Sequence, residues 1–149
     1  MADGEKTIDV SQYPDAFQYV SVTLGADTVD TTDTLDAYIM YCDRDTVVDA
    51  AFLSFTTVDG SNDATFQLQY VPSGLQDTVG DTPLGPESDS GTAITSTTTS
   101  GTTADASVAF TITETANVVP AGNRIALKVA GTSDIEGVNV TLRIRTRRK

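Results

Sequence analysis

The sequence predicts an all-β protein, folded as a single-domain β-sandwich of about eight strands in a jelly-roll-like order. Three observations predict this class. Several segments alternate apolar and polar residues with a period of two, which is typical of strands with one buried face. Turn-forming residues separate these segments, and no segment shows the 3.6-residue period of a helix. The chain has 149 residues, a length at which one domain can bury about 70% of the unfolded surface.

The chain begins with a polar segment that contains Pro14, which predicts an N-terminal arm at 1–16 followed by the sandwich domain at 17–149. The alternating segments predict the strands of that domain. In chain order they are expected at 17–24, 35–42, 47–58, 64–71, 107–114, 118–131 and 138–146, with a short additional strand near 92–98. Within 118–131, a Pro-Ala-Gly-Asn turn leads into the strand.

The alternation also predicts which side chains point into the core. The strand at 35–42 is an exception because it is apolar on both faces from Ile39 to Tyr41. For the other strands, the residues expected to point inward are Val20, Val22, Leu24, Phe66, Leu68, Tyr70, Val108, Phe110, Ile112, Ile125, Leu127, Val129, Val138, Val140, Leu142 and Ile144.

Two connections have distinctive compositions. The residues VDGSND (58–63) combine Asp-Gly and Asn-Asp turn chemistry between two strand patterns, which predicts a hairpin. Residues 72–107 are rich in Gly, Ser, Thr and Pro and are expected to form a long surface excursion. Because loops of this length without secondary structure are uncommon in compact domains, the short strand near 92–98 is placed within it.

Charge is distributed unevenly along this acidic chain, whose formal net charge is −12. Residues 1–123 contain nineteen acidic residues and two basic ones, a net of −17, whereas residues 124–149 contain seven basic residues against two acidic ones, a net of +5. Such asymmetry predicts an acidic exposed portion and a basic face that meets a partner.

Pairing of 124–130 with 138–146 as an antiparallel hairpin would merge the outward faces of the two strands into one basic patch. A protein partner is favoured over nucleic acid, because the charge of the remaining chain repels phosphates and no aromatic residue is interleaved with the arginines in the sequence. The tail, which also includes Lys149, could instead be merely solvated. The expected partner-binding residues are Arg124, Lys128, Arg143, Arg145, Arg147 and Arg148.

Several kinds of chemistry lack their usual residues. The chain contains no His, so it has neither a Ser-His-Asp triad nor an imidazole zinc site. No catalytic residue, cofactor or metal is expected, and the protein is not expected to be an enzyme. Cys42 lies in the apolar run AYIMYC and is expected to be a buried free thiol rather than a nucleophile.

Two acidic segments leave calcium binding open as an alternative, although a solvated loop and a plain turn are the preferred interpretations. Their oxygen-bearing residues are Asp27, Asp30, Asp33 and Asp36 in one segment and Asp59, Asn62 and Asp63 in the other. No apolar run approaches the about 20 residues of a membrane span, and the N-terminus is polar, so synthesis in a cytoplasm without membrane insertion is expected.

A succession of segments resembles small structural proteins of tailed bacteriophages, in particular the capsid decoration, or cement, proteins. The resemblance covers residues 35–146 and rests on the order of the patterns. The segments are DRDTVVDAAFLSFTT, ATFQLQYVPSG, the Gly/Thr-rich GTAITSTTT, VVPAGNRIALKVAGT and GVNVTLRIRTRRK.

The resemblance implies a β-sandwich protein that binds the outside of a phage head, often as a trimer, and reinforces the shell. We therefore expect a virion protein on the outer capsid surface, with the major capsid protein as its partner and a homotrimer ahead of a dimer. The alternative is a jelly-roll binding module of a phage tail or fibre that recognises carbohydrate.

Overall fold

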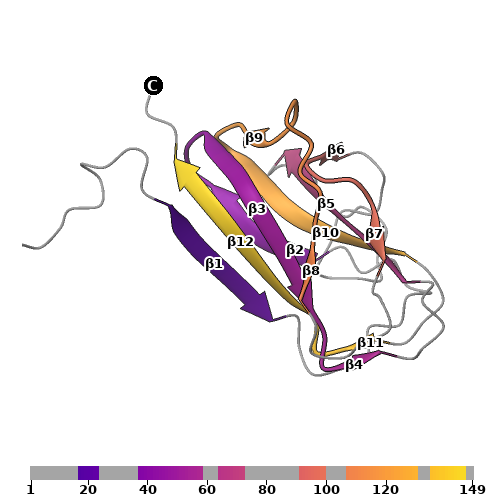
Figure 1. Ribbon diagram of the computed structural model, residues 1–149. Helices are drawn as coiled ribbons and strands as arrows, with labels where there is room; N and C mark the ends of the chain where they lie inside the picture. The colour runs from indigo at the N-terminus through magenta and orange to yellow at the C-terminus, as the bar shows by residue number, and fades with distance from the viewer. Residues whose placement is uncertain are drawn as a thin grey trace, which may run out of the picture.

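The structure, a computed structural model, describes residues 17–23, 37–58, 64–72, 91–99, 107–130 and 135–146. Over these ranges it contains strands and no helix. Two antiparallel sheets pack face to face and form a β-sandwich (Figure 1). The predicted all-β sandwich class is therefore confirmed. Residues 1–16, 25–36 and 147–149, where the predicted arm, the acidic loop and the end of the tail fall, lie outside the described residues.

The first sheet has the order β1-β12-β3-β8, and β9 pairs with the other end of β3. Its strands are β1 (Gln18–Thr23), β12 (Asn139–Thr146), β3 (Thr46–Ser54), β8 (Val108–Ala109) and β9 (Val118–Val119). In Figure 1, β1 forms the margin of this sheet beside β12.

The second sheet has the order β2-β10-β5-β6, and β7 also pairs with β5. Its strands are β2 (Ala37–Cys42), β10 (Asn123–Ala130), β5 (Thr65–Pro72), β6 (Thr92–Ala93) and β7 (Thr98–Thr99). A separate two-stranded ribbon is formed by β4 (Thr57–Val58) and β11 (Ile135–Glu136).

The pairing is nested in the manner of a jelly roll. When β6 with β7 and β8 with β9 are each taken as one strand position, the two sheets hold eight positions. The first position (β1) pairs with the eighth (β12), the second (β2) with the seventh (β10), the third (β3) with the sixth (β8 and β9), and the fourth (β5) with the fifth (β6 and β7). All these pairings are antiparallel, so the chain wraps around the core as a folded ribbon.

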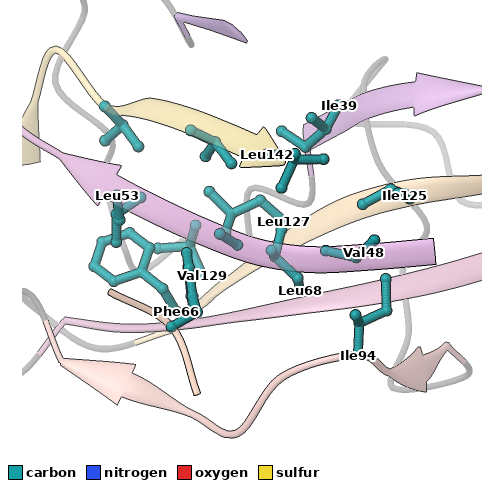
Figure 2. Close-up of a cluster of buried hydrophobic side chains, with 14 of the residues drawn as sticks. Ile39, Val48, Leu53, Phe66, Leu68, Ile94, Ile125, Leu127, Val129 and Leu142 are labelled. Carbon is teal, nitrogen blue, oxygen red and sulfur yellow. The ribbon is translucent and has the colours of Figure 1, made fainter. Parts of the chain in front are cut away.

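The core lies between the two sheets and combines inward side chains that the alternation predicts with others that it did not single out, such as Val48, Leu53 and Ile94 (Figure 2). Val20, Val22, Tyr70, Val108 and Ile112 are partly buried and pack against it. Leu24 lies outside the described residues. The predicted inward residues that are buried are Phe66, Leu68, Phe110, Ile125, Leu127, Val129, Val138, Val140, Leu142 and Ile144.

Two bulges interrupt the long strands. In β2 the register shifts so that Ile39 is an extra residue, because Met40 faces Ile125 while Tyr38 faces Ala126. Both Ile39 and Met40 therefore contribute to the core, which explains the two-sided apolar pattern of this strand. In β3 the extra residue is Asp49.

The middle of the predicted excursion completes the second sheet. The expected short strand is confirmed as β6 and β7, and Ile94 between them is fully buried. The backbone carbonyl of Leu68 accepts a hydrogen bond from the Ile94 N–H at 2.8 Å, and the Leu68 N–H donates to the hydroxyl of Thr95 at 3.0 Å. Residues 73–90 and 100–106 lie outside the described residues.

The expected hairpin at 58–63 is wrong. β3 belongs to the first sheet, β4 directly before 58–63 pairs with β11, and β5 after it belongs to the second sheet, so the chain crosses from one sheet to the other. The predicted strand 47–58 also divides in two, because β4 leaves the sheet to pair with β11. Asp-Gly and Asn-Asp turn chemistry is compatible with a connection within one sheet or between two sheets, so it does not reveal which sheet the next strand joins.

Two glycines adopt positive φ at turns. Gly122 (φ 86°) lies in the predicted Pro-Ala-Gly-Asn turn before β10, where the Asn123 N–H donates to the carbonyl of Pro120 at 3.3 Å. Gly137 (φ 63°) lies between β11 and β12, and a Cβ there would collide with the side chain of Thr56. Thr56 in turn donates from its N–H and its hydroxyl to the carbonyl of Glu136, at 3.0 and 3.1 Å.

Replacing Phe66 by Ala should lower the free energy of unfolding by about 3–5 kcal/mol, because the change leaves a cavity in the core. Phe66 is 1% exposed, and its ring centroid lies 5.2 Å from that of Phe55. Phe52→Ala is the matched control on an outer face and should cost about 1 kcal/mol or less. Urea unfolding of both variants measures the difference, and equal losses would contradict the assigned core.

Gly137→Ala should destabilise the protein more than Gly122→Ala. Both changes force Ala into a left-handed conformation, at a cost of about 1–2 kcal/mol. Only the first also displaces Thr56, because no atom lies within 4 Å of the Cβ position at Gly122. Thermal unfolding of the two variants tests this order, and a Gly122→Ala variant that melts at the lower temperature would refute it.

Candidate partner-binding faces

The predicted basic patch is divided between two opposite surfaces, which corrects the sequence-based expectation. β10 pairs with β2 and β5, whereas β12 pairs with β1 and β3, so the expected hairpin of 124–130 with 138–146 does not form. Arg124 and Lys128 lie on the solvent side of the second sheet, and Arg143 and Arg145 on that of the first. Arg147 and Arg148 lie outside the described residues.

The alternation of β10 and β12 predicts the outward direction of these cations correctly. In β10, Arg124 and Lys128 alternate with the buried residues Ile125, Leu127 and Val129. The error concerned only the partner of each strand. Two strands with the same alternation can pair directly or face each other across the core, and the apolar pattern fits both arrangements.

Arg143 lies at the centre of an aromatic group on the first outer face, the solvent side of the first sheet. Its guanidinium carbon is 4.9 Å from the ring centroid of Phe17, and its cross-strand neighbour on β1 is Tyr19. The Nε atom is buried without a hydrogen-bond partner, and no acidic side chain pairs with Arg143 among the described residues. This cation is therefore held in place by stacking and not neutralised by the described part of the chain.

Among the described residues, three of the four large apolar side chains that are exposed lie on this first outer face: Phe17 (53%), Tyr19 (68%) and Phe52 (37%). Phe52 projects outward from β3 between the buried Ala51 and Leu53. Aromatic side chains together with Arg are the residues enriched in the cores of protein interfaces.

Arg145 differs from Arg143 because it has an internal counter-ion. The bulge in β3 brings the carboxylate of Asp49 to 3.1 Å from Nε of Arg145, and Nε donates a hydrogen bond to it. Asp49 is the less exposed of the two side chains (15% against 40%). The pair therefore leaves Arg143 as the cation on this face without a described counter-ion.

A row of small polar side chains runs along the same face at the other end of β1 and β12. Ser21 hydrogen-bonds to the hydroxyl of Thr141 at 3.0 Å and donates to Oδ1 of Asn139 at 3.1 Å. The amide nitrogen of Asn139 donates to the hydroxyl of Thr23 at 2.9 Å. The first outer face is thus aromatic and cationic at one end and polar at the other.

The second outer face, the side of the second sheet turned away from the first sheet, is partly covered at Val71 and Ala126 and has a smaller version of this arrangement. The guanidinium carbon of Arg124 is 4.8 Å from the ring centroid of Tyr38. Tyr41, the cross-strand neighbour of Arg124, is 56% exposed. Each face therefore carries one arginine stacked on an aromatic ring, from Phe17 directly before β1 or from Tyr38 in β2, and more aromatic side chains are exposed on the first face.

The exposed aromatics were missed by the sequence analysis, although the signal was present. If Val20 and Val22 point inward in FQYVSVTL, then Phe17 and Tyr19 point outward. Large aromatic side chains gathered on an exposed face indicate an interaction site. In contrast, the stacking of Arg143 on Phe17 depends on the pairing of β1 with β12, which joins segments from the two ends of the chain.

Cys42 is buried, as predicted, at the end of β2. Burial is the main cause that raises the pKa of its thiol; the carboxylate of Asp43 adds to the rise, and a hydrogen bond with Thr46 opposes it. The raised pKa disfavours the thiolate, which is the nucleophilic form.

Within the described residues, no three His, Cys, Asp or Glu side chains are grouped so as to hold a metal ion. All residues of the two acidic segments considered for calcium, including Asp36 directly before β2, lie outside the described residues. No helix in the described part of the chain is long and apolar enough to cross a membrane. Comparisons with protein-family models, curated proteins and solved structures found no match.

Cys42 should react with iodoacetamide about tenfold or more slowly in the native protein than in urea, because the side chain is buried and the thiolate is disfavoured. Between pH 7 and 9, the rate should rise with pH in the unfolded chain, because a free thiol has a pKa of about 8.5. In the native protein the rate should rise less over the same range. Mass spectrometry of timed samples measures both rates. Equal rates in the two states would show that the thiol is accessible.

Proposed function

We propose that this chain is a non-enzymatic structural protein of a virion, a capsid decoration (cement) protein that binds the outer head surface and stabilises the shell. Its partner would be the major capsid protein, and the docking surface would be the first outer face. One observation carries the proposal. Arg143, without a described counter-ion, stands among the exposed rings of Phe17 and Tyr19 on the solvent side of a sheet. The sequence resemblance to decoration proteins supplies the class of partner.

The composition of this face favours a protein partner over nucleic acid. Aromatic residues are not interleaved with the arginines in the sequence, but Phe17 and Tyr19 lie beside Arg143 in space. Their absence near the arginines in the sequence therefore no longer speaks against nucleic acid. Charge remains the deciding factor. The chain carries −12, and Arg145 is already paired with Asp49, so this face offers no row of free cations for phosphates among its described residues.

Docking by this face would be adhesive. A guanidinium pre-oriented by stacking can donate hydrogen bonds to a carboxylate of the partner with little further ordering. The surrounding rings would bury apolar area in the contact. Exposed charge pairs contribute only about 0.2–1 kcal/mol each, so attachment would depend on the combination of rings and arginine. The symmetry of a capsid repeats the contact many times, and multivalency strengthens weak individual contacts.

Carbohydrate recognition by a phage tail or fibre module is the second candidate, and one observation favours it. The 68% exposed ring of Tyr19 lies on the same face as the polar row of Ser21, Thr23, Asn139 and Thr141. An apolar ring beside hydroxyl and amide groups is the combination that binds a sugar ring and its hydroxyls.

Arg143→Gln should weaken binding to empty phage heads by about tenfold, a loss of about 1.4 kcal/mol, and should reduce the salt dependence of binding. Arg124→Gln is the matched control, because it removes an arginine stacked on an aromatic ring from the opposite face. It should change binding by less than about twofold. Co-sedimentation with heads across a salt series measures both variants.

Equal affinities for parent and Arg143→Gln would show that the first outer face is not the docking face. Absence of head binding by the parent would reject the decoration function itself. A glycan array in which the parent binds and Tyr19→Ala does not would instead support the second candidate.

A further inference from the structure

The four edges of the two sheets are not protected equally. An open edge presents unpaired backbone N–H and C=O groups, and natural proteins block such edges with very short strands, bulges, charges or proline. The edges opposite β1 and β2 consist of two-residue strands: β8 and β9 in the first sheet and β6 and β7 in the second. The edge at β2 is interrupted by the bulge at Ile39. Three edges thus carry a blocking feature.

β1 carries none of these features. It has six residues, QYVSVT, without a charged residue or a proline. Its register with β12 continues without a shift from Gln18 to Thr23, so it contains no bulge. Within the described ranges β1 pairs only with β12, and its other side forms the margin of the sheet in Figure 1.

The side chains of β1 indicate that the sheet continues beyond it. Val20 and Val22 point inward and contact the core, yet they remain only partly buried. Their cross-strand partners on β12, Leu142 and Val140, are fully buried because β3 covers their other side. A further strand beside β1 would cover the two valines in the same way.

We propose that β1 pairs in an antiparallel manner with β1 of a second copy, across a two-fold axis, so that the first sheet continues from one copy into the other. The inward residues of β1, Val20 and Val22, have even numbers. In an antiparallel pair of two β1 strands they stay on the same side of the sheet when even-numbered residues of one copy face even-numbered residues of the other. Val20 then faces either Val20 or Val22 of the second copy. Both registers leave Phe17, Tyr19 and Ser21 on the outer face, so the aromatic group is repeated in each copy.

The uncharged sequence of β1 and the match between the valines of two copies favour a second copy as the occupant, against the repulsion of the net charges. Two chains of −12 repel each other, and the uncharged β1 is a segment on which they can meet without placing like charges in contact. The remaining repulsion acts at long range and is screened when the Debye length falls from about 10 Å at 0.1 M to about 3 Å at 1 M salt. The association of two copies should therefore strengthen as salt rises, whereas docking through Arg143 should weaken. A two-fold contact also closes at a dimer, not at the trimer that the resemblance implies.

Light scattering tests the proposal with the purified protein alone. At about 1 M salt, the parent should show twice the chain mass of 15.7 kDa at micromolar concentration, and its dissociation constant should fall as salt rises. Ser21→Lys places a charge on the edge strand and should return the mass to that of one chain. Thr141→Lys is the matched control, because Thr141 is the cross-strand partner of Ser21 on the interior strand β12. It changes the charge equally and disrupts the same polar row, but should leave the dimer.

Hydrogen exchange gives a second readout that does not depend on variants. Alternate amides of β1, those directed away from β12, should be protected in the dimer and exchange rapidly in Ser21→Lys. A monomer or trimer mass for the parent in high salt, equal masses for the two lysine variants, or rapid exchange of these amides in the parent would each overturn the proposal. None of these measurements involves heads, so the outcome is independent of the proposed function.

Discussion

The inward faces of β3 and β12 bury their apolar side chains against those of β5 and β10, and this contact positions every other feature of the molecule. A fully buried Val, Leu or Phe contributes about 1.5–3 kcal/mol, whereas a partly exposed ion pair such as Arg145 with Asp49 contributes about 0.2–1 kcal/mol. The packing of the core therefore determines where the charged side chains lie. Because Leu142 and Ile144 must point inward, Arg143 and Arg145 are fixed on the outer face.

The same constraint explains why the positive charge concentrated at the end of the sequence does not form one surface. β10 and β12 both belong to the core, but to different sheets, so their outward residues face away from each other across the sandwich. On the first outer face, the bulge at Asp49 then neutralises one of the two arginines. Local backbone geometry, rather than the number of basic residues, determines that Arg143 is the cation without a counter-ion among the described residues of this face.

How far the sequence could predict this structure depends on the range of each interaction. The direction of Ile125, Leu127 and Val129 was predictable because alternation along one strand is local. The strand near 92–98 was predictable because a long excursion needs backbone partners. The pairing partner of each strand was not predictable, because the turn residues of VDGSND are compatible with a connection within a sheet or between sheets. The stacking of Arg143 on Phe17 was likewise hidden, since it requires β1 and β12 to meet.

Nested pairing also sets the order in which the chain can fold. The hydrogen bond between Ser21 and Thr141 joins residues 120 positions apart, so β1 has no β12 to pair with until these intervening residues have been synthesised. Folds dominated by such distant pairings fold in about milliseconds to seconds, because the entropy of loop closure is lost before the stabilising contacts form. β5 with β6 and β7 can form much earlier. β1, which carries no charge to keep other strands away, is thus the last of the long strands to be paired and the segment most exposed to misassembly on crowded ribosomes.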